Sequence, residues 1–394
     1  MKLNLTSLPL AKLQRIADAL SPFELRLVGG VVRDLVAGVP AGDIDLCTTA
    51  TPDEMIACCN QASLRFEPTG IDHGTITIIV EGEGFETTSL RRDVATDGRR
   101  ATVAFTREFS EDAARRDFTI NALYAELDGT LYDPTGGVDD VRSGTLRFIG
   151  DPAERIQEDY LRILRFYRFY ARFGRTTPDE ATIQALQDFA PRITSLPSER
   201  IHPEVMKLLS AENPLPALQL MTEHSPLLDL LGLGDANLKA LASHYKHFGR
   251  TTPTERLACL LWHTDMPATL RRSHLHPSNA QMKTLSQLED TKTLPFQSDD
   301  PIAWAYRADY DLAPMQLRCR MAHKKIPLTL GSDALAKIAS TPAPLFPVSG
   351  DDLIKAGFTP GPDLGRMLNH LEDWWLNNGR PPRAACLHHL NEIL

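Results

Sequence analysis

Short hydrophobic runs alternate with amphipathic segments along roughly the first 147 residues. Alternating apolar and polar positions predict strands, and apolar positions three or four apart predict helices. Glycine-containing turns at 82–84 and 128–129 join neighbouring strands into hairpins. The expected strands are 24–28, 43–48, 75–80, 85–90, 121–126 and 130–132, and the expected helices are 1–20, 31–37 and one that starts at Thr51–Pro52. The pattern predicts a small mixed sheet with helices.

From Pro152 onward the pattern is helical. Ile156, Leu164, Phe169 and Phe173 recur at helical spacing. The later helical segments are separated by prolines, which end helices because they lack the backbone N–H. We therefore predict an α+β head followed by an all-α remainder.

The composition is that of an ordinary globular protein. The chain has 394 residues, 42% of them hydrophobic and 24% charged, which predicts roughly two to four domains. No apolar stretch approaches the ~18 residues that a membrane span requires, and residues 1–20 are typical of an amphipathic helix, not of a signal peptide. The six cysteines show no CxxC spacing, which argues against a zinc knuckle or a disulfide framework. We expect a reduced, cytoplasmic protein without membrane contact.

The charges narrow the function. A net charge of −9 argues against a general nucleic-acid coat protein, although a local basic groove remains compatible with it. Lysine makes up 11 of the 42 basic residues, and none lies between Gln14 and Met206. This excludes a P-loop or Schiff-base lysine in that half and fits bidentate recognition of phosphates and bases by arginine. Biased codon usage is the alternative explanation.

Two aspartates and a glycine pair mark the first candidate site. Gly29 and Gly30 precede a predicted helix, whose N-terminal N–H groups can approach a phosphate closely. Asp43 and Asp45 lie two apart on a predicted strand, so both carboxylates point to one face. Such like charges repel unless a cation lies between them, and Mg²⁺ bridges carboxylates to substrate phosphates. Glu86 can add a third carboxylate if its strand lies beside Asp43; solvent-exposed strand carboxylates are the alternative.

Two arginine-rich segments follow. Residues 91–100 have mixed charges and an Asp-Gly step, which predicts a solvated loop. Residues 115–122 place Arg116, Asp117 and Asn121 just before an apolar strand. This second cluster suits contacts to a triphosphate and a ribose, and a structural knot of ion pairs is the alternative.

A third cluster lies on the first long helical segment. Arg155, Asp159 and Arg162 are four and three residues apart, so on a continuous helix they share a face. A carboxylate can accept from the amino group of cytosine or adenine while an arginine donates to the neighbouring ring nitrogen. Guanine and uracil present a carbonyl and an N–H there, so an Asp159–Arg162 pair would select C and A. A surface ion pair without base preference is the alternative.

Taken in order, these motifs resemble those of the tRNA nucleotidyltransferases, the CCA-adding enzymes, in the class with bacterial and eukaryotic members. The resemblance runs from about Leu27 to Leu209, and the C-terminal part is similar to alphaproteobacterial-type members. It rests on six blocks: Gly29-Gly30-x-Val32-Arg33-Asp34 with Asp43-Ile44-Asp45-Leu46, Glu86-Thr87-Thr88, Arg115 to Ala122, Asp133 with Gly136-Gly137, Glu158-Asp159-x-x-Arg162-x-x-Arg165, and Ser198-Glu199-Arg200-Ile201 with Glu204.

The resemblance implies a fold and a reaction. It implies a head with a nucleotidyltransferase-type mixed sheet over 1–147, a base-recognising helical neck over 148–210, a helical body over 211–290 and a helical, tRNA-binding tail over 291–394. CTP and ATP would donate C, C and A to the tRNA 3′ end without a template, by a two-metal mechanism that releases pyrophosphate.

It also implies roles for individual residues. Asp43, Asp45 and Glu86 would be catalytic, with Mg²⁺ on Asp43 and Asp45, and Arg200 with Glu204 would support the neck. The nucleotide-binding residues would be Gly29, Gly30, Arg33, Arg116, Asp117, Asn121, Asp159, Arg162 and Arg165.

Three alternatives stay open. A poly(A) polymerase of the same superfamily typically has Pro after the Glu-Asp of the neck motif, whereas Tyr160 stands there. An enzyme that adds only the two cytidines is disfavoured because the segment 91–100 looks complete, and the resemblance associates the presence of this segment with addition of the final A. A catalytically silent RNA-binding protein is disfavoured because all three carboxylates are present.

Overall fold

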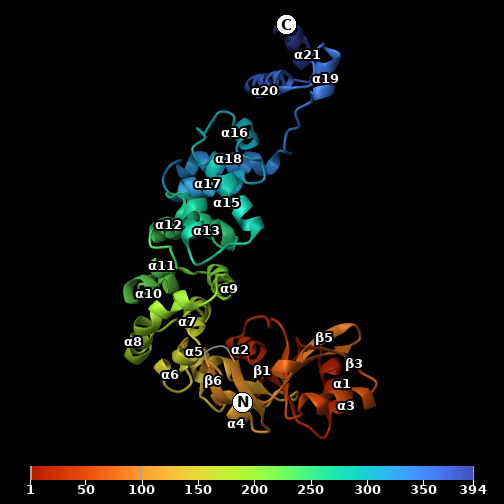
Figure 1. The fold of residues 1–394 in the computed structure, drawn as a ribbon, viewed down its shortest axis with the longest axis vertical. Helices are drawn as coiled ribbons and strands as arrows, with labels where there is room; N and C mark the ends of the chain where they lie inside the picture. The colour runs from red at the N-terminus through yellow and green to blue at the C-terminus, as the bar shows by residue number, and fades with distance from the viewer. Residues whose placement is uncertain (1, 98–99, 394) are drawn as a thin grey trace. The chain divides into compact units, whose positions relative to one another are not determined.

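The computed structural model describes residues 2–97 and 100–393 (Figure 1). The chain divides into two units, Met1–Ala236 with Arg272–His276, and Asn237–Arg271 with Pro277–Leu394. The first unit carries the sheets and the candidate site. The second unit is helical.

A seven-stranded mixed sheet forms the frame of the first unit. Its strand order is β3-β4-β5-β2-β1-β8-β9. Strands β2 and β5 pair in parallel, whereas the other neighbours pair antiparallel. The strands are β1 (Leu25–Val28), β2 (Asp45–Thr48), β3 (Arg65–Gly70), β4 (Thr75–Val80), β5 (Glu83–Ser89), β8 (Tyr124–Ala125) and β9 (Leu131–Tyr132). The expected mixed sheet is thus confirmed.

The sheet differs from the sequence prediction at two places. Strand β2 begins at Asp45, so Asp43 lies in a bend before the strand and not on it. Strand β3 was not predicted, because it is a largely exposed edge strand that contains Pro68 and lacks alternating apolar residues. It extends the sheet beyond β4, with which it pairs antiparallel.

Helices cover the sheet and follow the expected start signals. Helix α3 begins with a capping box, in which Thr51 and Glu54 satisfy each other's backbone N–H groups. Helix α1 buries Leu13, Ile16 and Leu20 and starts only after Pro9, later than the predicted 1–20. The helices are α1 (Leu10–Leu20), α2 (Gly30–Ala37), α3 (Pro52–Gln61), α4 (Phe109–Ala114) and α5 (Gly137–Ser143), with short 3-10 turns at Ile71–His73 and Thr119–Asn121.

The segment expected to be a loop at 91–100 is a β-hairpin instead. Strands β6 (Arg91–Asp97) and β7 (Arg100–Phe105) form a separate two-stranded antiparallel sheet. The loop prediction was wrong because the mixed charges of this segment leave no regular alternation of apolar and polar residues in the sequence. Residues 98–99 lie outside the described residues.

The predicted long helix after Pro152 is broken in two. Helix α6 (Pro152–Glu158) ends at Asp159, whose backbone is extended with φ −157° and ψ 108°, and α7 (Leu161–Phe173) begins two residues later. Arg155, Asp159 and Arg162 therefore do not share one continuous helix. The first unit continues with α8 (Glu180–Phe189), a 3-10 turn at Ala190–Ser195, α9 (Ser198–Leu209), α10 (Leu215–His224) and α11 (Leu227–Leu230).

Helices α12 to α21 follow, as the sequence predicts for the last third of the chain. Hydrophobic clusters form around the fully buried Trp304 and around Leu371 with Trp375. None of the helices in the described part of the chain combines the length and hydropathy that crossing a membrane needs. The helices are α12 (Leu238–Phe248), α13 (Pro253–Leu261), α14 (Met266–Arg272), α15 (Asn279–Thr291), α16 (Pro301–Arg307), α17 (Ala313–Ala322), α18 (Leu328–Ser340), α19 (Gly350–Lys355), α20 (Pro362–Asn377) and α21 (Arg383–Ile393).

Candidate active site

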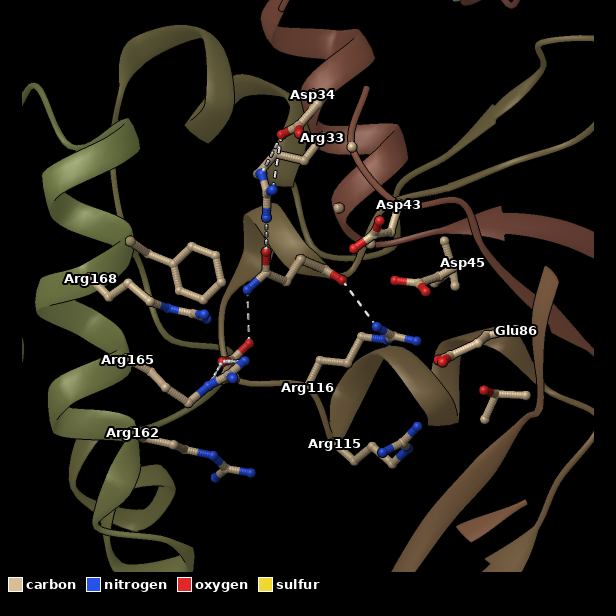
Figure 2. A pocket seen from close by; sticks show the side chains of 18 of the residues that line it. Arg33, Asp34, Asp43, Asp45, Glu86, Arg115, Arg116, Arg162, Arg165 and Arg168 are labelled. Atoms are coloured by element: carbon tan, nitrogen blue, oxygen red, sulfur yellow. Dashed lines mark hydrogen bonds and ion pairs between the residues drawn. The ribbon is translucent and has the colours of Figure 1, made fainter. Parts of the chain in front are cut away.

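A cavity of about 810 Å³ in the first unit is lined by residues of β2, β5, α2 and α7 (Figure 2). This volume lies in the range of small-molecule sites. The lining includes all twelve candidate residues: Gly29, Gly30, Arg33, Asp43, Asp45, Glu86, Arg116, Asp117, Asn121, Asp159, Arg162 and Arg165. Nine arginines line the cavity, and among the described residues no lysine does. Residues up to 172 positions apart in sequence thus meet in one basic, carboxylate-containing pocket.

Three carboxylates gather on one side of this pocket. Asp45 and Glu86 are register partners in the parallel β2–β5 pair, and Asp43 lies in the bend just before β2. Burial raises the pKa of Asp45, and the charges of Glu86 and Asp43 raise it further. Figure 2 shows the three side chains opposite the arginines of α7. A cation at this point would relieve the mutual repulsion of the carboxylates.

The donor set fits a hard divalent cation completed by substrate. Among the described residues, no three His, Cys, Asp or Glu side chains already form a ready metal cluster. Mg²⁺ is commonly held by one or two carboxylates together with substrate phosphates and water. The oxygens of Asp43, Asp45 and Glu86 therefore suit an ion that arrives with a phosphorylated ligand.

The turn from β1 into α2 brings backbone close to the pocket. Gly29 caps α2 with φ +68°, a left-handed conformation that favours glycine. Its neighbours are close, since a Cβ there would lie 3.6 Å from Nη1 of Arg116 and 3.6 Å from the carbonyl oxygen of Asn121. The first N–H groups of α2 therefore lie at the pocket wall, where they can face an anion.

A chain of hydrogen bonds connects the 115–122 cluster to α2 and α7 (Figure 2). Arg33 Nη1 donates to Asn121 Oδ1 at 2.7 Å, and Asn121 Nδ2 donates to Asp117 Oδ1 at 3.1 Å. Arg165 Nε donates to Asp117 Oδ2 at 2.7 Å. Burial alone would raise the pKa of Asp117, but Arg165 and the hydrogen bond from Asn121 outweigh it and lower the pKa. Asp117 is therefore held as a carboxylate.

Asp159 and Arg162 both line the pocket but do not bind each other. Arg162 Nη1 binds Glu158 and the carbonyl oxygen of Arg155, the latter at 2.7 Å. Asp159 Oδ2 binds Arg200 Nη2 of α9 at 2.8 Å. The expected pair on one helical face is thus replaced by two separate ion pairs, because the backbone turns out of the helix at Asp159.

One residue behind the site escaped the sequence analysis. Asp112 is buried, with an exposed side-chain fraction of 1%, and binds Arg115 at 2.6 Å and Arg116 at 3.0 Å. It also accepts a hydrogen bond from the hydroxyl of Tyr124 at 2.9 Å. Asp112 lies on α4, three and four residues before Arg115 and Arg116, which follow the end of that helix. This spacing was the available signal.

Comparison with known proteins identifies relatives of this chain. A family model described as "Poly A polymerase head domain" matches residues 25–147, and one described as "Probable RNA and SrmB- binding site of polymerase A" matches residues 177–231. CCA tRNA nucleotidyltransferase 1, mitochondrial, of Danio rerio is 36% identical over 372 residues, covering 90% of this chain and 83% of the relative. The human protein of the same name is 34% identical with the same coverage. A CCA-adding enzyme of Leuconostoc mesenteroides is 31% identical over 369 residues, covering 91% of this chain and 89% of the relative.

Solved structures agree in fold. The CCA-adding enzyme of Bacillus stearothermophilus in complex with CTP has a TM-score of 0.78 and 25% identity, covering 98% of both chains. A Thermotoga maritima CCA-adding enzyme complexed with tRNA matches in fold, with a TM-score of 0.66 and 20% identity. The narrower resemblance to alphaproteobacterial-type members is not borne out, because these relatives come from vertebrates and from other bacteria.

Proposed function

Because this chain belongs to the family of CCA-adding enzymes, the CCA tRNA nucleotidyltransferases, we propose that its basic pocket is where a tRNA 3′ end receives C, C and A. The reaction joins the α-phosphate of CTP or ATP to the terminal 3′-hydroxyl without a template and releases pyrophosphate. The observation that supports this site most directly is the register of Asp45 with Glu86, opposite the arginines of α7.

The family uses a divalent metal, and we propose Mg²⁺ here. Asp43 and Asp45 would hold it, and Glu86 would contribute the third carboxylate. When bound, such an ion lowers the pKa of the attacking hydroxyl and neutralises charge on the triphosphate. All three carboxylates line the pocket, which allows the substrate phosphates to complete the coordination.

The protein's own groups would orient the nucleotide. The N–H groups at Gly29 and Gly30 can face the triphosphate, whose negative charge the pocket arginines balance. Asn121 and Asp117 lie next to Arg116, where they can bind ribose and phosphate. Arg33 is buried against Asp34 and Asn121, so it would contact the triphosphate through the donors that these bonds leave free.

Base selection is assigned to Asp159 and Arg162. Asp159 is paired with Arg200, and Arg162 is paired with Glu158. These partners keep both charged groups paired at the pocket wall, from which they can turn to the base. The hydrogen-bond pattern of cytosine and adenine then matches the acceptor of Asp159 and the donors of Arg162.

The remaining assignments are also proposals. The head would cover 1–147, the neck 148–210, the body 211–290 and the tRNA-binding tail 291–394. A cytoplasmic location is supported by the cysteines, all six of which are free thiols.

One assay tests the proposed function. A tRNA that lacks its 3′ CCA is incubated with CTP, with ATP and with both, and the products are resolved at single-nucleotide length. We expect two additions with CTP and three with both nucleotides. A long adenosine tail would indicate a poly(A) polymerase. Two additions with CTP and no third addition with both nucleotides would indicate a CC-adding enzyme, and no addition in any arm a silent RNA-binding protein.

A further inference from the structure

Helix α7 is bound to α2 by an ion pair between Arg172 and Asp34, two residues that have no role in the proposed function. Arg172 Nη2, in the last turn of α7, lies 3.0 Å from Asp34 Oδ2, in the first half of α2. The side chain of Asp34 is 3% exposed, whereas that of Arg172 is 52% exposed. A buried carboxylate of one element thus receives an arginine from another.

The same carboxylate also holds Arg33. Asp34 Oδ1 accepts from Arg33 Nε at 3.0 Å and from Nη2 at 2.9 Å, which leaves Oδ2 for Arg172. Burial lowers the pKa of Arg33, and the charge of Asp34 opposes this shift. Asp34 therefore stabilises the buried guanidinium and binds α7 at the same time.

This contact closes a ring of interactions around the end of α7. Arg33 continues through Asn121 and Asp117 to Arg165, which lies seven residues, or about two turns, before Arg172. The Arg33 guanidinium also lies 4.3 Å from the centre of the Phe173 ring, which stacks on Phe169. Helix α7 is thus fixed to the first turns of α2 at two places along its length, through Arg165 and through Arg172. Its rotation and its translation are both constrained.

We propose that Arg172 is a positioning residue for base selection. By pairing with Asp34 it fixes α7 against α2 and so sets the place of Arg162, about 15 Å earlier along the same helix, relative to the phosphate-facing turn. The proposal rests on the proposed function, in which Arg162 reads the base. A shift of α7 would move Arg162 relative to that turn, and so weaken discrimination between bases.

The test compares Arg172→Met with a matched control, Arg107→Met. Arg107 is similarly exposed, at 58%, binds Glu54 at 2.8 Å and lies 5.1 Å from the Phe23 ring, but does not line the pocket. For each purified full-length variant, kcat and KM are measured for CTP, ATP, UTP and GTP on tRNA lacking CCA. We expect Arg172→Met to lower the preference for CTP over UTP about tenfold, corresponding to loss of one charge-assisted hydrogen bond. Arg107→Met should retain the wild-type preference, and Arg172→Lys should restore most of it.

A second comparison separates positioning from general loss of structure. In an Arg162→Ala background the base-reading group that α7 carries is gone, so adding Arg172→Met should cause no further loss of preference. A full additional tenfold loss there would overturn the proposal, as would equal behaviour of Arg172→Met and Arg107→Met. If Arg172→Met fails to fold by circular dichroism, Arg172→Gln carries the same expectations. Absence of any CTP incorporation by the wild-type protein would instead contradict the proposed function.

Discussion

Asp159 and Arg200 form an ion pair that connects the break between α6 and α7 to α9, with Arg200 Nη2 2.8 Å from Asp159 Oδ2. Both side chains are 27% exposed, so neither charge is fully removed from solvent. Asp159 also accepts a hydrogen bond from the backbone N–H of Leu161 at 3.1 Å, which caps the start of α7. The carboxylate assigned to base reading is therefore already oriented by two groups.

Replacing Asp159 should change which bases are accepted. Asp159→Ala removes the acceptor for the amino group of C or A, and losing a bond to a charged group costs on the order of 1.5–3 kcal/mol. We expect roughly tenfold to a hundredfold weaker selectivity, with measurable incorporation of UTP or GTP in competition with CTP and ATP. Arg200→Met keeps the Asp159 acceptor and should lose less selectivity. An unchanged preference in folded Asp159→Ala would leave the residue as a helix cap and ion-pair partner only.

Removing either aspartate of the proposed metal site should stop the reaction without preventing tRNA binding. Asp43→Ala and Asp45→Ala are expected to abolish incorporation of both nucleotides, because the cation and the substrate phosphates lose their anchor. Gel-shift measurements should show that both variants retain their affinity for tRNA. Glu83→Gln, also on β5 but paired with Lys12 outside the pocket, is the matched control and should remain active. Near-normal turnover in either aspartate variant would contradict the metal assignment.

The Asp45 carboxylate opposes folding when no cation is present. The pKa of Asp45 is raised by burial and by its acidic neighbours, so its ionised form is disfavoured in the folded state at neutral pH. We expect metal-free Asp45→Asn to melt at or above the wild-type temperature at pH 7.5. We also expect added Mg²⁺ to raise the melting temperature of the wild type more than that of Asp45→Asn. A variant that melts well below the wild type would mean that the Asp45 charge is stabilising.

The hairpin of β6 and β7 should matter for the last nucleotide. Deleting residues 93–99 is expected to spare addition of the cytidines and to impair addition of A, as the family resemblance of this segment implies. The assay compares CTP incorporation with ATP incorporation on tRNA that already ends in CC. Equal loss of both additions would make the hairpin a general structural element.

Asp112 should make the first unit sensitive to acid. Burial alone would raise the pKa of Asp112, but Arg116 and Arg115 outweigh it and lower the pKa below that of an unfolded aspartate. Its stabilising effect is therefore fully present above about pH 4 and is lost as the pH falls through the lowered pKa. At pH 7, Asp112→Asn should lower the free energy of unfolding by about 3 kcal/mol, since it leaves two arginines without their buried partner. Denaturant titrations should show this difference shrinking below pH 4, and a constant difference would contradict the assignment.

The sequence predicted the parts of the site whose signal is local. Strand alternation placed β4 and β5 correctly, and the glycine pair located the turn into α2. The sequence could not predict that Glu86 lies beside Asp45. Their proximity follows from the parallel pairing of β2 with β5, which depends on the order of strands in the sheet and not on the residue pattern of either strand. Asp159 was misplaced for a related reason. The side chain of Asp159 binds Arg200 of α9, a helix that begins 39 residues later. The spacing of residues around Asp159 cannot predict a contact with so distant a segment.

The arginine-only lining of the pocket has a practical consequence for labelling. Reagents that acylate amines react with lysine and leave guanidinium groups unmodified, because arginine stays protonated under coupling conditions. The lysines are Lys2, Lys12 and nine residues from Lys207 onward, and none of them lines the pocket in the described part of the chain. A fluorophore or a solid support attached through amines will therefore leave the chemistry of the pocket intact, so that nucleotide addition can be followed on immobilised or dye-labelled protein.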